Sequence, residues 1–132
     1  MLRMLWIYHV LLIYIRSNNM PFMIGFAENR RNMLQAELMR FLDELPPLGV
    51  QQIFVIGDFA LSHVGIETAL ELLIIQETDE PFHRRPDFFV DHLRPRIETR
   101  FYVYTPDEFD QLKDIDPFLV RHINQSEAVY AI

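Results

Sequence analysis

The chain has 132 residues, of which half are hydrophobic and a little under a quarter are charged, a composition typical of one globular domain and not of a disordered chain. The absence of cysteine excludes disulfides, thiol nucleophiles and cysteine-ligated zinc, and it is compatible with the cytoplasmic location that we predict. All 19 acidic residues lie at or after Glu28, so that the body, with ten basic residues, carries a net charge of −9, which argues against nonspecific nucleic-acid binding.

Residues 1–19 differ in composition from the rest of the chain. Their apolar run, Met4–Ile15, has 12 residues and is shorter than the roughly 20 that span a bilayer as a helix. Three interpretations stay open: translation from Met20, a short membrane or interface anchor, or an extra structural element. We therefore predict an apolar leader followed by one domain, 20–132, and expect membrane association only if the leader belongs to the protein.

The first half of the body predicts a helix followed by a buried strand. Apolar residues recur every three or four positions over Glu28–Leu45, which indicates a helix with one buried stripe, and Pro46-Pro47 ends it. Ile53–Ile56 is a continuous apolar run, typical of a strand that is buried on both faces. Gly57-Asp58 closes that strand in a turn.

The remainder alternates short helices with strands. In chain order we expect a short helix or loop at Phe59–Val64, a buried strand at Thr68–Ile75, a helix at Pro86–Leu93 and a third strand at Ile97–Tyr104. A helix start with a capping box follows at Thr105–Glu108, then a helix at Phe118–Asn124 and a last strand at Ala128–Ile132. Such alternation indicates a sheet with helices packed on it. We therefore predict an α/β fold of the α+β type, with a small mixed sheet and helices mainly on one face.

A carboxylate inside the second strand is the main candidate for function. Side chains alternate across a strand, so Glu71 shares a face with Ala69, and Glu98, Arg100 and Tyr102 share a face of the third strand. If these strands are neighbours, Glu71 approaches Glu98 or Arg100. A charge in a hydrophobic run is costly without a partner or a chemical role, so Glu71 is either paired with Arg100 or a metal ligand.

Four stretches of the body form a larger pattern: IGDFALSHVG, TALELLII, YTPDEF and FLVRHINQSEAVY. Together they resemble the minimal nucleotidyltransferases of the DNA polymerase β superfamily, over roughly residues 29–130. In that family a Gly-Ser turn binds phosphate, two aspartates at alternate positions of the next strand hold two divalent metals, and a later strand adds a third carboxylate. The resemblance implies a nucleotidyltransferase fold here.

This sequence departs from the family pattern at the positions that carry the chemistry. The first aspartate position is Ala69, which has no ligand atom, and the second is Glu71. Asp58 stands at the serine position, and the third acidic position falls near Arg100, with Glu98 the nearest carboxylate. The resemblance makes Glu71 and Glu98 the candidate metal ligands. It makes Gly57 and Asp58 the candidate nucleotide-binding residues, and it assigns no catalytic residue.

Three functions remain open. One is a degenerate nucleotidyltransferase-like domain that binds a nucleotide or a partner protein without transfer. Another is an active, divergent enzyme that uses Mg²⁺ to move a nucleoside monophosphate from a nucleoside triphosphate (NTP) to a protein or small-molecule hydroxyl, with Glu71 as metal ligand and Glu98 and Glu67 assisting it. The third, which the resemblance implies, is an antitoxin-like subunit that pairs with a small helical protein or with a second copy. Mg²⁺ and an NTP are expected cofactors only of the active enzyme.

Simpler or rearranged roles also exist for several of these residues. Asp58 suits a turn or a helix cap. His83-Arg84-Arg85 is a small basic cluster that fits a solvated face, although it would also suit a phosphate. The acidic residues Asp58, Glu67, Glu71 and Glu98 have the oxygen ligands for a regrouped Mg²⁺ site.

Overall fold

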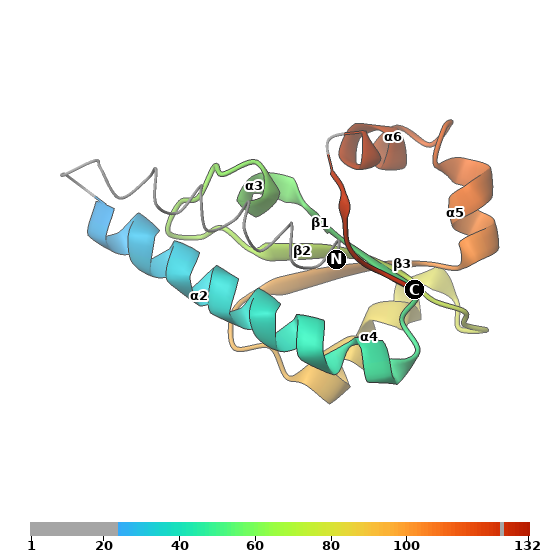
Figure 1. Ribbon diagram of the computed structural model, residues 1–132, viewed down its shortest axis with the longest axis horizontal. Coiled ribbons are helices and arrows are strands. Elements are labelled where there is room, and N and C mark those ends of the chain that lie inside the picture. The colour runs from blue at the N-terminus through green and yellow to red at the C-terminus, as the bar shows by residue number, and fades with distance from the viewer. Residues whose placement is uncertain (1–23, 125) are drawn as a thin grey trace.

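The computed structural model describes residues 24–124 and 126–132, so the predicted leader, 1–19, lies outside the described residues. In chain order its helices and strands are α2 (Ile24–Glu44), β1 (Gln52–Ile56), α3 (Gly57–Ala60), β2 (Leu70–Ile75), α4 (Arg85–Leu93), β3 (Thr99–Tyr104), α5 (Pro106–Leu112), α6 (Pro117–Ile123) and β4 (Ala128–Ala131) (Figure 1). Two short 3₁₀ turns, Pro46–Leu48 and Phe82–Arg84, precede β1 and α4. No helix in the described ranges is long and apolar enough to cross a membrane.

The strands of the described chain form one mixed sheet in the order β3-β2-β1-β4. β1 is antiparallel to both β2 and β4, whereas β2 and β3 run parallel, as neighbours joined through a helix usually do. The predicted α+β class with a small mixed sheet is therefore confirmed. The second and third strands are neighbours, and Glu71 lies opposite Arg100 in their register.

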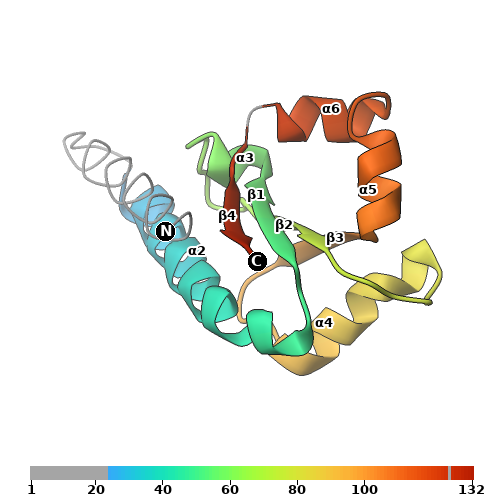
Figure 2. The same cartoon turned by 45° about the vertical axis from the view of Figure 1, so that its right-hand side comes forward.

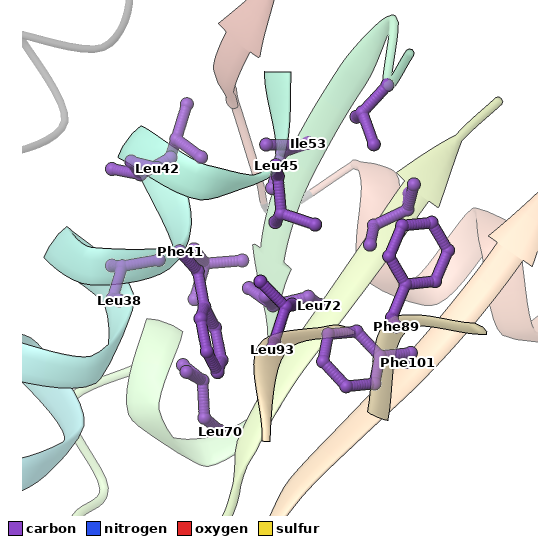
Figure 3. Close-up of a cluster of buried hydrophobic side chains, with 14 of the residues drawn as sticks. Leu38, Phe41, Leu42, Leu45, Ile53, Leu70, Leu72, Phe89, Leu93 and Phe101 are labelled. Carbon is purple, nitrogen blue, oxygen red and sulfur yellow. The ribbon is translucent and has the colours of Figure 1, made fainter. Parts of the chain in front are cut away.

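The longer helices, α2 and α4, cover one face of the sheet, and the short helices α5 and α6 lie against part of the other (Figures 1 and 2). The larger core lies under α2 and α4, where Phe41 and Phe89 pack on either side of Phe101 with ring centroids 6.0 and 5.6 Å away (Figure 3). A smaller cluster joins Phe54 of β1 to Phe109 of α5. Glu71 belongs to this second, more open face.

Element boundaries differ from the predictions by a few residues, for local reasons. α2 spans Ile24–Glu44, so it includes four residues before the predicted start at Glu28. β2 begins at Leu70, because Thr68 closes a turn with Gly65, whose backbone N–H donates to Thr68 Oγ1 at 2.8 Å. The capping box at Thr105 is confirmed, with both of its reciprocal hydrogen bonds present.

Glu37 and Arg40, an ion pair within α2, hold this helix to the segment between α4 and β3 through hydrogen bonds to its backbone. Glu37 is 4 % exposed and accepts from Arg40 Nε at 2.7 Å and from the backbone N–H of Arg96. Arg40 also donates to the backbone oxygen of Leu93 at 2.8 Å, at the end of α4. Burial alone raises the pKa of Glu37, but the hydrogen bonds from Arg40 and Arg96 outweigh burial and lower it below 4.5.

Acid is expected to release this ion pair. Because the pKa of Glu37 is lower in the folded chain than its unfolded value of 4.5, its stabilisation is complete above about pH 4.5 and is lost as the pH falls through the folded-state pKa. Urea unfolding of Glu37→Gln should therefore show lower stability than the wild type at pH 7 and a shallower decline below pH 4.5. Equal slopes for the two proteins in acid would contradict this role of Glu37.

The end of α4 offers a stabilising substitution. Arg94 has φ 45°, a left-handed conformation that costs a residue with a Cβ atom about 1 kcal/mol and that glycine adopts freely. Arg94→Gly should raise the free energy of unfolding by about 0.5–1 kcal/mol, measured by urea unfolding at pH 7. The control is Arg96→Gly: Arg96 has no positive φ, so this change should destabilise instead.

Candidate functional site

Glu71 is the second residue of β2, near the end of the sheet at which β1 passes into α3. It lies opposite Ile56 of β1 and Arg100 of β3. Because side chains alternate along a strand, Glu71 shares its face with Leu73, which packs in the smaller cluster with α5 and α6. Its side chain is 18 % exposed, so the carboxylate is mostly shielded from water.

Three neighbours fix the position of the Glu71 carboxylate. The hydroxyl of Tyr102 donates to Glu71 Oε1 at 3.2 Å, and Arg100 Nη1 lies 3.7 Å from the same oxygen. Gly57 is so close that a Cβ atom added there would lie 1.8 Å from Glu71 Oε2. Gly57 also has φ 78°, so glycine is required at this turn for its backbone conformation and for the space that Glu71 occupies.

Arg100 lies between the two carboxylates that were predicted as metal ligands. Its guanidinium is 3.7 Å from Glu71 and 3.2 Å from Glu98, which confirms the predicted approach of Arg100 to Glu71. The hydrogen bond to Glu98, then the charges of Glu98 and Glu71, raise the pKa of Arg100. Arg100 and Glu98 are each 55 % exposed, so water weakens these ion pairs, but the arrangement places a fixed positive charge between both carboxylates.

Helix α6 covers the other side of this group. Phe118 packs on Tyr102 with ring centroids 4.8 Å apart, and His122 lies 4.6 Å from Phe118. Burial lowers the pKa of His122 while the charge of Glu71 acts in the opposite direction, and the net lowering leaves His122 neutral at pH 7. Burial, and then Glu71, raise the pKa of Tyr102, so its hydroxyl keeps the proton that it donates.

The candidate nucleotide-binding residue Asp58 lies beside a different feature. Asp58 is exposed at the start of α3, and together with His63 and Glu67 it lines an open hollow of about 630 Å³. Asp58 is the second residue of α3, whose N-cap is Ile56, so it does not occupy the cap position that was one of its alternative roles. Neither Glu71 nor Glu98 lines this hollow.

The donor set does not fit a pair of divalent metals. Glu71 and Glu98 each lie within ion-pair distance of the Arg100 guanidinium, which takes the place where a metal ion would bind both. Ala69 is buried and has no ligand atom. Over residues 24–124 and 126–132, no three His, Asp or Glu side chains are grouped closely enough to hold a metal ion. The regrouped site of Asp58, Glu67, Glu71 and Glu98 is therefore not assembled in this arrangement.

The sequence pattern did not show the roles of two polar residues. The hydroxyl of Tyr102 donates to Glu71, and the strand alternation that placed Tyr102 on the face of Arg100 was the available signal. Arg85 was assigned to a solvated basic cluster, but it is buried and pairs with Glu108 at 2.6 Å. Only His83 and Arg84 of that cluster are exposed, which leaves a phosphate fewer charges to use.

Comparison of this chain with known protein families, curated proteins and solved structures gave no match.

Proposed function

We propose that the chain is a nucleotidyltransferase-like domain that has lost metal-dependent transfer and acts by binding a nucleotide or a partner protein. The observation that carries this proposal is the position of Arg100. Its guanidinium takes up the negative charge of Glu71 and Glu98, the two side chains that would otherwise serve as metal ligands. The sequence resemblance supplies the family, and the ion pairs supply the reason for lost transfer.

A guanidinium is a poor replacement for a catalytic metal ion. It neutralises carboxylates, but it has no open coordination position and cannot activate an acceptor hydroxyl as a bound metal does. Tyr102 adds a hydrogen bond that further fixes the Glu71 carboxylate. With Ala69 at the first ligand position, this group of side chains favours a structural role for Glu71 over metal ligation.

Binding without transfer is proposed to occur beside α3. The turn at Gly57 exposes the start of α3, and the open hollow lined by Asp58, His63 and Glu67 adjoins it. The two carboxylates at this hollow repel triphosphate, so the base and sugar of a nucleotide, or a protein segment, fit its charge better.

The test combines a transfer assay with a binding measurement. The protein is incubated with each of the four NTPs, labelled at the α-phosphate, with Mg²⁺ or Mn²⁺ and with a lysate of its source as acceptor. We expect no labelled product, while amide resonances of Gly57–Thr68 shift on addition of a nucleotide. Metal-dependent labelling that is lost in Glu71→Gln would overturn the proposal in favour of the divergent enzyme.

Partner binding is the second way in which such a domain acts. Exposed apolar side chains occur in α2 and in two turns, with exposures of 78 % for Phe26, 65 % for Ile66 and 72 % for Ile115, but scattered side chains of this kind do not mark an interface by themselves. Copurification of the untagged chain from its source, followed by light scattering, tests for a stable second subunit. A strictly monomeric protein that also binds no nucleotide would contradict both forms of the proposal.

A further inference from the structure

A second hollow, which we call the β3-edge groove, lies on the far side of the molecule from the loop at Asp58. It has a volume of about 220 Å³ and lies between the loop after β2 and the first turns of α4. Figure 2 shows that loop leaving β2 and running outward before it turns back into α4. Phe88, Phe89 and Val103 form the apolar walls of the groove.

The walls combine a buried floor with an exposed aromatic side. Phe89 and Val103 are buried in the main core, whereas Phe88 is 42 % exposed and meets Phe89 edge-on with ring centroids 5.2 Å apart. An aliphatic chain in the groove would therefore contact apolar surface on several sides.

The mouth of the groove is negatively charged. Glu77 and Glu80 line it, Asp79 lies between them in sequence, and all three are exposed with no ion pair to any residue of the described ranges. Arg85 also lines the groove, but its charge is matched by Glu108, with two hydrogen bonds of 2.6 and 3.2 Å. The groove therefore combines apolar walls with exposed carboxylates that have no ion-pair partner in the described ranges.

We propose that the β3-edge groove docks a long cationic side chain, Lys or Arg, from a basic segment of a partner protein. The side chain would lie along the open groove, with its methylene stem against Phe88, Phe89 and Val103 and its charged end beside the exposed carboxylates of Glu77 and Glu80. The chain carries a net charge of −7, so it would also attract a basic segment of a partner over a longer distance. This inference does not depend on the function proposed for Glu71.

Nuclear magnetic resonance titration with short peptides tests the proposal, because it detects weak binding and locates it. The probe is Ac-Gly-Lys-Leu-Lys-Gly-amide, compared with the same peptide carrying glutamate in place of lysine and with 1,5-diaminopentane. We expect the lysine peptide alone to shift the amide resonances of residues 76–80, 88–89 and 103. The double variant Glu77→Gln/Glu80→Gln should weaken its affinity at least tenfold, and Phe88→Ala at least threefold.

A matched control separates docking from general attraction between opposite charges. Asp107→Asn/Asp114→Asn removes the same charge from exposed positions around α5 and should leave the affinity within twofold. An equal loss in this control, or shifts spread over the whole acidic surface, would overturn the proposal. So would diaminopentane binding as tightly as the peptide, since the groove would then be a site for small amines, and so would the absence of any shift.

Discussion

Replacement of Arg85 by methionine is expected to lower the free energy of unfolding by about 2–4 kcal/mol. Arg85 is 8 % exposed and donates to Glu108 through two nitrogens, to the backbone oxygen of Glu80 at 2.8 Å and to that of Val103 at 3.1 Å. Methionine fills a similar volume but leaves these acceptors without their donor. Because the hydrogen bond from Arg85 also lowers the pKa of Glu108, this part of the loss is complete above about pH 4.5 and shrinks as the pH falls through the folded-state pKa.

Chemical denaturation of two further variants identifies the cause. Arg84→Met changes the exposed neighbouring arginine and should alter stability by less than about 0.5 kcal/mol. Arg85→Lys keeps the positive charge but loses the paired hydrogen bonds, so its stability should lie between that of the wild type and Arg85→Met. If Arg84→Met and Arg85→Met were equally mild, the link between α4, β3 and α5 would not rest on this ion pair.

Gly57→Ala is the second large effect, expected to lower the free energy of unfolding by about 2–4 kcal/mol. A side chain at φ 78° is strained, and the new methyl group would collide with the carboxylate of Glu71. The carboxylate can move away only by giving up its hydrogen bond from Tyr102 and its approach to Arg100. Denaturant unfolding, with the Tyr102 hydroxyl resonance as a local probe, measures both consequences.

Gly49 provides the matched control for this substitution. It has φ 94°, but a Cβ atom there would lie 3.5 Å from Gln76 Nε2, an ordinary contact. Gly49→Ala should therefore cost only the backbone strain, about 1–2 kcal/mol. If the collision with Glu71 causes the extra loss in Gly57→Ala, the double variant Gly57→Ala/Glu71→Ala should regain the amount of unfolding free energy by which Gly57→Ala exceeds Gly49→Ala. If the losses of the two single variants simply add in the double variant, there is no collision.

The fold followed from local patterns because those patterns reflect the physics of burial. Each of three local patterns predicts one helix or strand from the residues of that element alone: the apolar stripe over Glu28–Leu45, the apolar run Ile53–Ile56 and the capping box at Thr105. The parallel pairing of β2 and β3 then follows from the intervening α4. The function proposed for the site, by contrast, rests on a family resemblance and on ion pairs, and it stays a prediction.

Tertiary surroundings decided what the sequence pattern left open. Arg84 and Arg85 are adjacent and chemically identical, yet only Arg85 faces the backbone oxygen of Val103, because the start of α4 turns it toward β3. The pairing of Arg100 with Glu71 was predictable from strand alternation once the two strands were assumed to be neighbours. The position of His122 near Glu71 had no such signal, since it depends on how α6 packs over the sheet.

In the proposed function Arg100, and not a metal ion, neutralises Glu71 and Glu98. Paramagnetic broadening by Mn²⁺ in the presence of ATP distinguishes the two, with the amide resonances of Leu70–Leu73 and Phe101–Val103 as reporters. We expect no selective broadening of these resonances in the wild type and its appearance in Arg100→Gln, where both carboxylates lose their ion-pair partner. Strong broadening at β2 in the wild type, abolished by Glu71→Gln, would instead make Glu71 a metal ligand.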